Sequence, residues 1–361
     1  MNQRTVVILA AAFVALAVLV TLGQRSGTSS SGNGASFVPG LESALGDIER
    51  VTVVKANGET VATLERGPDN WVVTDKHGYL ANASKLRQAL TGLAEAHILE
   101  QKTANAELYG RLGVEDVTGV DAAGLSVAFT ATGKQFPTVI LGNAEGSKYR
   151  YVRLAGEAQS YLIDRNPAFS RTAAQWLDAE IIDVRSDRVR EVTITHADGE
   201  VVNISKSGPE LTNFEVTNVP AGRELLYPGV ANVIGNALRE LNLEDVEPAL
   251  ATAVEQPTVV EVRTFDGLVV RITGTKTADA SFVSLAASVD AEQAAQAAAA
   301  AVAATAPAAE GAATPATPPA DPNDEAARIN AKVGAWRYKI AGFQYDQMTR
   351  RMSDLLKPPA I

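Results

Sequence analysis

Short runs of the chain alternate hydrophobic and polar residues at the period of two that a half-buried β-strand requires. Two such stretches, residues 51–68 (VTVVKANGETVATLERGP) and 192–209 (VTITHADGEVVNISKSGP), align without a gap and share V, T, A, G, E, V, G and P at equivalent positions. Each contains a turn pair, Asn57-Gly58 or Asp198-Gly199, of the kind that accepts positive φ in a tight hairpin. The pattern predicts an internal duplication whose copies each open with a β-hairpin.

The spacing of apolar residues changes after each hairpin to three and four, which predicts a helix. The stripe in copy one follows a candidate N-cap, Ser84, and consists of Leu86, Ala89, Leu90, Leu93 and Ala94; the stripe in copy two consists of Val230, Val233, Ile234, Ala237, Leu238 and Leu241. Further β-type runs follow in both copies: residues 125–130, 136–141, 149–154 and 160–164, then 259–265, 268–273, 282–285 and 336–340. We therefore predict an α+β fold of two tandem related modules, residues 46–185 and 186–358, each of antiparallel strands plus a helix.

An uncharged apolar run covers residues 6–22 between Arg4 and Arg25. Extended by its neighbours to residues 5–23, it would span roughly 28 Å as a helix at about 1.5 Å per residue, close to the hydrocarbon thickness of a bilayer. We predict a transmembrane anchor over residues 6–23, a cytoplasmic tail over 1–5 and a flexible Gly/Ser-rich linker over 24–45. The positive charge before the run favours an exported body. A cleaved signal peptide is the alternative, since Thr21-Leu22-Gly23 offers small residues at a suitable spacing.

Residues 286–327 are rich in alanine and contain five prolines. Residues 291–304 have the propensity for a helix but little to bury, and the prolines that follow break both helices and strands. We predict a mobile insertion in a surface loop of the second module, between strands at 282–285 and 336–340. A docking arm for a partner is the alternative.

Composition argues against several classes of partner and site. The formal net charge of −10, without a basic stripe, disfavours a nucleic-acid partner. The chain has no cysteine, which excludes disulfides and thiolate metal sites, and it has three histidines. We expect His77 and His196 to be solvated beside turns and His97 to be a half-buried structural residue. No metal and no cofactor is predicted.

Motifs of the common hydrolases, nucleotide-binding proteins and zinc peptidases do not occur in the sequence. The acidic pairs Glu115/Asp116 and Glu244/Asp245 are expected to be solvated near turns. Core packing is expected for Trp71, Trp176 and Trp336. Tyr149, Tyr151 and Tyr161 alternate on predicted strands and could line a face that binds a peptide or glycan. No catalytic, cofactor-binding or metal-binding residue is predicted, and the protein is expected not to be an enzyme.

Several short motifs carry a family resemblance. Together with the single N-terminal span, the segments LYGRLG (108–113), ILG (140–142), YVR (151–153) and YLID (161–164) resemble the bacterial domain of unknown function family 4340, DUF4340. The resemblance covers most of the chain from about residue 47, and the long Ala/Pro insertion departs from it. It implies a membrane-anchored protein linked with an ABC-type transport system similar to that of gliding motility, alongside a companion extracytoplasmic subunit. No catalytic residue comes with the resemblance.

These observations lead to one functional expectation and two alternatives. We expect a non-enzymatic accessory or scaffold subunit of an ABC-type transport assembly, held in the bacterial cytoplasmic membrane with its body on the periplasmic side. The first alternative is a periplasmic binding module for an envelope glycan or peptide. A hydrolase with an unrecognised carboxylate site ranks behind both.

Overall fold

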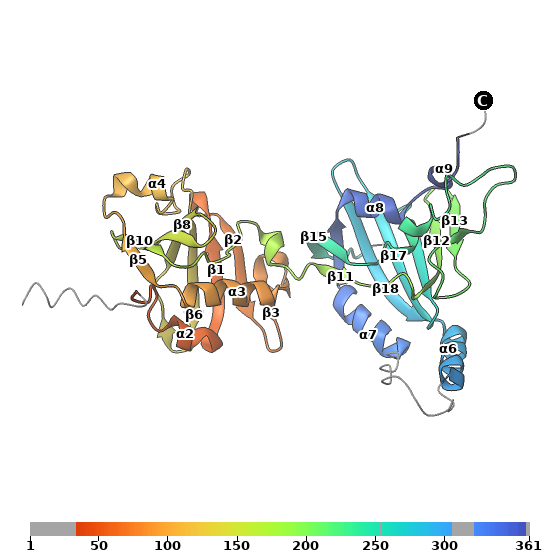
Figure 1. The fold of residues 1–361 in the computed structure, drawn as a ribbon, viewed down its shortest axis with the longest axis horizontal. Coiled ribbons are helices and arrows are strands. Elements are labelled where there is room, and N and C mark those ends of the chain that lie inside the picture. Colours follow the sequence, from red (N-terminus) through yellow and green to blue (C-terminus); the bar gives the residue numbers. More distant parts are fainter. Residues whose placement is uncertain (1–33, 253, 305–320, 359–361) are drawn as a thin grey trace, which may run out of the picture. The chain divides into compact units, whose positions relative to one another are not determined.

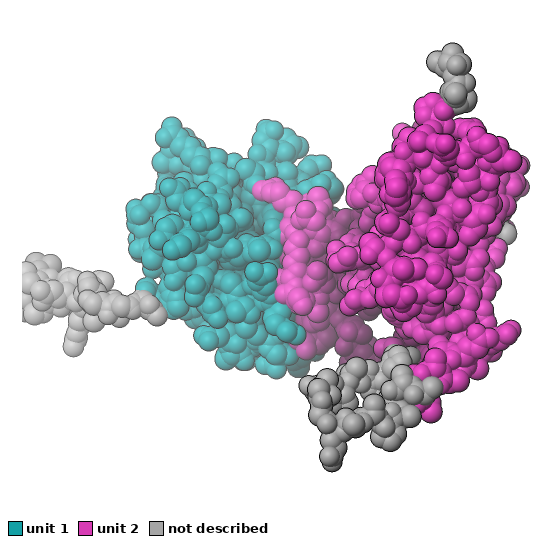
Figure 2. Space-filling model, turned by 45° about the vertical axis from the view of Figure 1, so that its right-hand side comes forward, with its two compact units in different colours: residues 1–60, 87–169 teal, residues 61–86, 170–361 magenta. Residues whose placement is uncertain are grey.

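The computed structural model describes residues 34–252, 254–304 and 321–358, which form a mixed α/β structure with two antiparallel sheets (Figure 1). Two compact units divide the chain: Met1–Thr60 with Arg87–Phe169, and Val61–Leu86 with Ser170–Ile361 (Figure 2). The predicted anchor at 6–23 and residues 24–33 of the predicted linker lie outside the described residues. The rest of the predicted flexible linker, residues 34–45, is wrong: it contains a helix at Leu41–Ala44, and Phe37, Val38 and Leu41 are buried. Within the described part, no helix has both the length and the apolar character needed to span a bilayer.

The first sheet has the strand order β4-β3-β2-β1-β6-β8-β9-β10-β5, with β7 paired to β6. Its strands are β1 (Ile48–Val54), β2 (Thr60–Arg66), β3 (Trp71–Val73), β4 (Tyr79–Leu80), β5 (Ile98–Gln101), β6 (Leu125–Ala131), β7 (Lys134–Gln135), β8 (Val139–Glu145), β9 (Tyr149–Leu154) and β10 (Ser160–Ile163). The helices of this part are α2 (Leu41–Ala44), α3 (Ala83–Ala94) and α4 (Tyr109–Leu112). Short 3-10 turns cover Leu45–Asp47, Ala56–Gly58, Thr74–Lys76 and Ala106–Leu108.

The second sheet has the strand order β11-β15-β19-β18-β17-β16-β12-β13-β14. Its strands are β11 (Glu180–Ile182), β12 (Val189–Thr195), β13 (Val201–Ser205), β14 (Glu215–Val216), β15 (Leu241–Pro248), β16 (Thr258–Thr264), β17 (Leu268–Lys276), β18 (Ser281–Val289) and β19 (Trp336–Ile340). The helices are α5 (Asn232–Gly235), α6 (Ala291–Ala304), α7 (Pro322–Val333), α8 (Gly342–Met348) and α9 (Met352–Leu355), and a 3-10 turn covers Ala173–Trp176.

The two sheets place corresponding strands in the same order. Starting from β3, the first sheet runs β3-β2-β1-β6-β8-β9-β10-β5; starting from β14, the second runs β14-β13-β12-β16-β17-β18-β19-β15. Counted along the chain, each position holds the equivalent strand of its copy, and β4 and β11 are additional edge strands. The turns Asn57-Gly58 and Asp198-Gly199 join equivalent hairpin strands, β1 to β2 and β12 to β13.

The helix of copy one is capped two residues earlier than expected. Ser84 was predicted as N-cap, but α3 already begins at Ala83, and the side-chain Oδ1 of Asn82 accepts the hydrogen bond from the Lys85 backbone N–H at 2.9 Å. Asparagine is as good an N-cap as serine, so local pattern alone did not separate the two. The apolar stripe itself is buried as predicted, with Leu86 and Leu93 almost fully enclosed.

The predicted helix of copy two is wrong beyond its first turn. Only Asn232–Gly235 is helical, and Leu241 already begins β15. A Cβ added to Gly235 would lie 2.1 Å from the Phe214 ring, so the chain bends closely around that side chain. The amide side chain of Asn232 accepts from the Phe214 N–H at 2.9 Å and donates to Asn213 at 2.7 Å. Such side-chain bonds compete with helix extension, and the periodic apolar residues instead fill a turn.

The predicted mobile insertion is also partly wrong. Strand β18 continues through Val289, and α6 and α7 occupy Ala291–Ala304 and Pro322–Val333; residues 305–320 lie outside the described part. The carboxylate of Asp290 accepts from the Gln293 N–H at 3.1 Å and caps α6, whose other side chains are largely exposed, as expected for alanines with little to bury. The insertion joins β18 to β19, where the equivalent strands β9 and β10 are joined by residues 155–159.

Helix α7 packs along β18, with Ala326 and Val333 buried (Figure 1). The side-chain amide of Asn330 accepts from the Ala287 N–H and donates to the Ala287 carbonyl, both at 2.8 Å, and so pairs with the backbone of β18 as a strand would. A polar anchor therefore joins α7 to the strand edge that β19 leaves uncovered, because β19 pairs only with Ser281–Val283 of β18.

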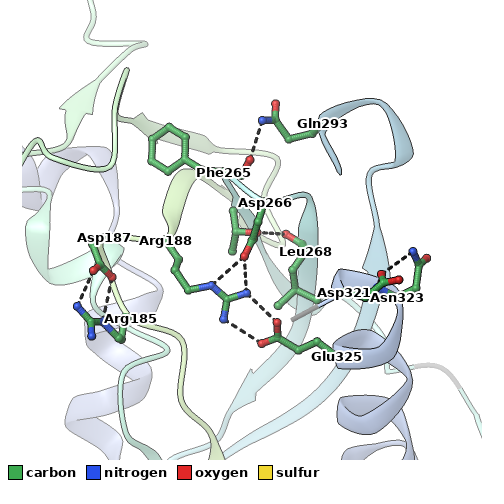
Figure 3. A network of polar contacts seen from close by, with 11 residues as sticks. Arg185, Asp187, Arg188, Phe265, Asp266, Leu268, Gln293, Asp321, Asn323 and Glu325 are labelled. Carbon is green, nitrogen blue, oxygen red and sulfur yellow. Dashed lines mark hydrogen bonds and ion pairs between the residues drawn. The ribbon is translucent and has the colours of Figure 1, made fainter. Parts of the chain in front are cut away.

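A second anchor of α7 is the guanidinium of Arg188, at the start of β12 (Figure 3). Arg188 donates to Asp266 in the β16–β17 turn at 3.1 and 2.7 Å, and to Glu325 in α7 at 2.9 and 2.7 Å. The hydrogen bonds to Glu325, followed by the attraction of Asp266, raise the pKa of Arg188 above its ordinary value against the opposing effect of burial. This ion triad ties the insertion to the sheet.

Candidate functional site

The residues of the family-like motifs come together in the first unit, around Arg153 of β9. The Arg153 side chain is 3% exposed, and its Nε donates to the Val114 carbonyl at 2.8 Å. Its two terminal nitrogens donate to the Glu157 carbonyl at 2.9 Å and to Asp116 Oδ1 at 2.6 Å. The guanidinium lies 4.6 Å from the centre of the Tyr109 ring of α4. We call this arrangement the Arg153 cluster.

Two glycines let the backbone come close enough to form the Arg153 cluster. A Cβ at Gly142 would lie 2.3 Å from the Leu112 carbonyl oxygen, and one at Gly124 would lie 2.5 Å from the Gly113 carbonyl oxygen. Real side chains do not tolerate such distances, so β8 and the α4 loop meet only because these positions lack a Cβ. Tyr109, Val114 and Ile140 then form a small buried apolar group against which Leu112 and Tyr151 pack.

The contacts of the Arg153 cluster are those of a group that stabilises the fold. The hydrogen bonds that Arg153 donates end on carbonyls and a carboxylate of the same unit, and the Tyr109 hydroxyl donates to the Ala158 carbonyl at 2.5 Å. Asp116, one of the predicted solvated carboxylates, is 68% exposed at its side chain and pairs with Arg153. Glu115 is half-buried, and its Oε2 has no hydrogen-bond partner among the described residues. Nothing in this group combines a nucleophile with a base.

The second predicted acidic pair lies elsewhere. Glu244 and Asp245 lie on strand β15 and not beside a turn, and Glu244 is 3.8 Å from the Lys339 Nζ of β19. The prediction placed them after a helix that the structure does not form. Their exposed or half-buried side chains agree with the solvated role expected of them.

The three histidines lie in three different settings. His77 is exposed in a turn with a φ of 57°, as predicted. His97 is half-buried, its Nδ1 lies 3.5 Å from Asp164 Oδ2, and its backbone N–H donates to Asp164 at 2.8 Å, which agrees with a structural role. His196 was predicted to be solvated, and this is wrong: it is 6% exposed, and its Nε2 is buried with no hydrogen-bond partner in the described part of the chain.

A polar pocket of about 520 Å³ adjoins His196 in the second unit, at the end of the sheet where α8 and α9 lie (Figure 1). Its other walls come from the loop before β16, from β16 and β17, and from α8 and the start of α9; they include Gln256, Thr258, Thr275, Lys276, Tyr345 and Arg351. We call it the His196 pocket. The Tyr345 ring packs directly over Gly274, where a Cβ would lie 2.8 Å from the ring, and burial raises the pKa of Tyr345.

Charged groups in and beside the His196 pocket are paired with one another. Lys276 of β17 pairs with Asp346 of α8. Arg351 pairs with Asp198 at 2.8 Å and with Glu200, and Glu200 also accepts from the backbone N–H that follows Arg351 at 2.8 Å. The backbone N–H of Glu200 and then the Arg351 guanidinium lower the pKa of Asp198. These ion pairs fasten α9 to the β12–β13 hairpin.

A second hollow of about 460 Å³ lies over β12, β16 and β17 and is lined by arginines and glutamates. Arg263 pairs with Glu261 at 2.6 Å and with Asp290 at 3.2 Å, while Arg271 approaches Glu261 at 3.6 Å. Opposite charges alternate across this face, so it presents no net field of one sign to a ligand. Among the described residues no group of histidines and acids is arranged to hold a metal ion.

The aromatic residues divide between core and surface. Trp176 is fully buried and donates to the Ser170 carbonyl at 3.3 Å, as expected of a core residue, whereas Trp71 and Trp336 are half-buried. The three tyrosines do not share one face: Tyr161 is opposite Val152, and Tyr151 is opposite Leu162, so neighbouring strands point Tyr151 and Tyr161 to opposite sides of the sheet.

The tyrosines are also engaged with neighbours. Tyr161 packs edge-on against Phe37 at 6.0 Å, and the Tyr151 hydroxyl donates to Glu145 at 2.8 Å. That hydrogen bond raises the pKa of Tyr151. Tyr149, at the end of β9, is 38% exposed. The predicted tyrosine-lined binding face is therefore not formed by these three residues together.

Comparison with known proteins identifies the family. A family model described as a domain of unknown function (DUF4340) matches residues 71–259, more than half of the chain. The matched range includes the Arg153 cluster and the second sheet as far as the start of β16. No curated protein and no solved structure matches the chain. This protein belongs to the DUF4340 family.

Proposed function

We propose that this protein is a non-enzymatic accessory subunit of an ABC-type transport assembly. In this proposal, residues 6–23 anchor it in the cytoplasmic membrane, and the two sheet-forming modules, related by duplication, act outside the cytoplasm by binding partner subunits. The equivalent strand orders of the two sheets support the duplication. Membership of the family supports the link that the sequence motifs implied.

The observation that carries the non-enzymatic part of the proposal is the Arg153 cluster. An enzyme family is usually recognised by motifs that supply its nucleophile, base or ligands. Here the recognisable segments around Tyr109, Gly142 and Arg153 form the buried contacts of the Arg153 cluster, which hold α4 against β8 and β9. In this chain these segments build a packed part of the fold, which favours a role in binding over a role in catalysis.

The titration behaviour of the carboxylates supports the same conclusion. A general acid at neutral pH needs a carboxyl pKa raised by burial or by a neighbouring negative charge. Where a carboxyl shift is resolved in the described residues, at Asp187, Asp198, Glu224 and Asp321, hydrogen bonds or cations lower the pKa. These groups are held as carboxylates and serve in ion pairs and caps.

Exposed aromatic side chains in the second unit indicate where a partner could bind. Phe343 of α8 is 65% exposed, and Tyr227, in the loop before α5, is 55% exposed. Helices α5 and α8 contact one another, so both side chains come from one region of the unit. Large aromatic rings left in water mark interaction surfaces more often than isolated aliphatic residues do.

The decisive experiment is site-specific photo-crosslinking of the full-length protein in its membrane. A photoreactive residue replaces Phe343 or Tyr227, and a matched control carries it at the exposed polar position Asp279. We expect adducts with subunits of a transport assembly, identified by mass spectrometry, from the two aromatic positions and not from the control. Equal labelling at all three positions, or no adduct at the aromatic positions, contradicts the proposal.

The topology is tested separately. A reporter that is active only outside the cytoplasm, fused after Ile361, is expected to be active, and the mature protein is expected to retain residues 6–22. Activity of a cytoplasm-specific reporter at the same position contradicts the exported body. Recovery of a mature chain that starts after residue 23 contradicts the anchor.

A further inference from the structure

We propose that the His196 pocket is a binding site for a neutral polyhydroxylated ligand, a saccharide of about the size of a disaccharide. This inference goes beyond the accessory role and does not depend on it, because the pocket lies wholly within the second unit. It rests on a difference between the two copies, on a buried imidazole nitrogen that has no hydrogen-bond partner among the described residues and on the chemistry of the pocket walls.

Comparison of the two copies shows what is special about His196. The equivalent residue of copy one is Lys55, whose Nζ pairs with Glu59 at 2.8 Å. The hydrogen bond that closes the hairpin is the same in both copies, since Lys55 N–H donates to the Glu59 carbonyl and His196 N–H donates to the Glu200 carbonyl, each at 2.9 Å. In copy two the carboxylate of Glu200 is taken by the start of α9 instead. The side chain at position 196 is thereby released from the structural pair that its counterpart forms.

The imidazole that results is buried without a hydrogen-bond partner at Nε2 among the described residues. A buried polar nitrogen left unsatisfied destabilises a fold, and such groups are few in native proteins. The ring forms part of the pocket wall, and rotation about its Cβ–Cγ bond has a broad, roughly two-fold profile that can turn a ring nitrogen toward a ligand. A ligand hydroxyl would satisfy it as donor or as acceptor.

The other walls of the pocket select the class of ligand. They offer the hydroxyls of Thr258, Thr275 and Thr349 and the amide of Gln256, groups that pair with alcohol oxygens in both directions. The volume of about 520 Å³ falls within the range of about 300–1,000 Å³ that small-molecule sites occupy. Its lining residues other than Gly274 and Tyr345 are polar or charged, which disfavours a lipid ligand.

The charges of the pocket argue against an anion. The carboxylates on its walls, Glu255, Asp346 and Asp354, outnumber the cations Lys276 and Arg351. Both cations are already paired with carboxylates of the unit. A phosphate or a carboxylated ligand would therefore meet uncompensated negative charge, whereas a neutral sugar would not.

The backbone at Gln256 adds a further feature of the pocket wall. Gln256 has a φ of 48°, in the left-handed region that residues other than glycine and asparagine rarely adopt. A side chain kept in such a conformation at a ligand-sized pocket is typical of a binding position. It also provides a test variant, because Gln256→Gly removes the amide while relieving the backbone strain.

The test measures saccharide binding to the full-length protein, purified in a detergent without a sugar headgroup. The probes are N,N′-diacetylchitobiose and cellobiose, with a hexuronic-acid disaccharide and a tripeptide as the anionic and peptide comparisons, and the readouts are calorimetric affinity and saturation-transfer NMR. The variants are His196→Ala, Gln256→Gly and the matched control Lys55→Ala at the equivalent position of copy one. Circular dichroism confirms that each variant is folded.

We expect at least one neutral disaccharide to bind, with affinity reduced about tenfold by His196→Ala and by Gln256→Gly, as for the loss of one buried hydrogen bond, and unchanged by Lys55→Ala. If His196→Ala does not fold, Gln256→Gly alone decides. Absence of binding by either neutral disaccharide refutes the proposal, and so does binding that neither pocket variant weakens. Preferential binding of the uronic-acid disaccharide or of the tripeptide shows that the assigned ligand class is wrong. A failed crosslinking experiment would leave this result untouched, and the reverse also holds.

Discussion

Replacing the buried guanidinium of Arg153 tests whether the family-like motifs serve packing. In Arg153→Met an apolar chain of similar length fills the same space, but the donors to the carbonyls of Val114 and Glu157 are lost, as is the contact with the Tyr109 ring. The carboxylate of Asp116 is 68% exposed and returns to water. The perturbation is therefore a loss of hydrogen bonds and ring contact with little change in volume.

The expected loss of stability follows from the burial of each partner. Val114 is fully buried, so its carbonyl is left unsatisfied at about 1–3 kcal/mol. The carbonyl of Glu157, an exposed residue, is rehydrated and contributes little. The cation–π contact adds about 0.5–2 kcal/mol, and the exposed ion pair with Asp116 about 0–1 kcal/mol. These ranges together span about 1.5–6 kcal/mol, and we expect Arg153→Met to destabilise the first unit by about 2–4 kcal/mol, near the middle of that span.

The assay must report on the first unit alone. Tryptophan fluorescence does not isolate the first unit, because Trp176 and Trp336 belong to the second unit and Trp71, grouped with the second unit as well, lies on β3 of the first sheet. Amide hydrogen exchange read by mass spectrometry resolves the peptides of β8 and β9 directly. The expected loss corresponds to exchange on the order of 30- to 1,000-fold faster in those peptides, with peptides of β16 and β17 unchanged.

Two control variants give the outcome that would refute this reasoning. Arg111→Met makes the same chemical change at an exposed position of the same motif and is expected to cost within about 0.5 kcal/mol. Asp116→Asn keeps an acceptor for the guanidinium and is expected to cost less than about 1 kcal/mol. If Asp116→Asn is as damaging as Arg153→Met, the charge pair and not the buried carbonyl holds the cluster. If Arg153→Met leaves exchange unchanged, the Arg153 cluster does not stabilise the first unit.

Further predictions concern the second unit. Gly274→Ala forces a Cβ against the Tyr345 ring and should destabilise the unit by about 1–3 kcal/mol, measured by urea unfolding followed by tryptophan fluorescence. The control Gly342→Ala has open space around it and should be neutral or stabilising by up to about 1 kcal/mol. Equal effects of the two variants would contradict the packing argument. Glu325→Gln removes one carboxylate of the ion triad that anchors α7 and should reduce the stability of α7 by about 1–2 kcal/mol. Amide exchange in α7 peptides should then be about 5- to 30-fold faster. Unchanged exchange would show that the triad is not needed to hold α7. The pKa of Asp198 in the folded protein is lowered below its usual 3.8, so the stability that its carboxylate contributes is present above that value and is lost as the pH falls through the lowered pKa. Protection of α9 against amide exchange should therefore decline below a pH of about 4 in the wild type. A decline of the same size in Asp198→Asn would refute the assignment.

Elements specified by local chemistry were predictable from the sequence. The turn pairs Asn57-Gly58 and Asp198-Gly199 lie between hairpin strands, with positive φ at Asn57, Gly58 and Gly199, angles that few residue types other than glycine and asparagine accept. The alternating runs became strands, and the stripe of α3 became a buried helical face, because one side of each had a sheet or core to cover.

Two errors arose where a local signal was overridden by a neighbour distant in sequence. The stripe after Val230 has the spacing of a helix, but the close contact of Gly235 with Phe214 and the side-chain bonds of Asn232 turn the chain instead. The Ala/Pro-rich composition of residues 286–327 indicated a mobile insertion, but α7, which begins within it, finds partners in Arg188 and in the backbone of Ala287. In both cases the partner lies outside the segment whose structure it determines, so the sequence of that segment does not reveal it.

The candidate site was the least predictable part of the protein. His196 beside a polar turn has the local sequence of a solvated residue, yet it is buried. Its neighbour Glu200 pairs with Arg351, which lies more than a hundred residues later, just before α9. The alignment of the two copies contained a signal, since His196 stands where copy one has Lys55, but that substitution has meaning only once the partner of each glutamate is known.

The sequence by itself therefore determined the duplicated α+β plan, the hairpin turns, the family and the lack of familiar catalytic motifs, because each of these depends on residue types at short spacing. Tertiary structure alone decided the Arg153 cluster, the ordering of the insertion and the His196 pocket. In each case a polar group from one element is paired or left unpaired by a group from a distant element, and the free energy of burying it depends on that pairing.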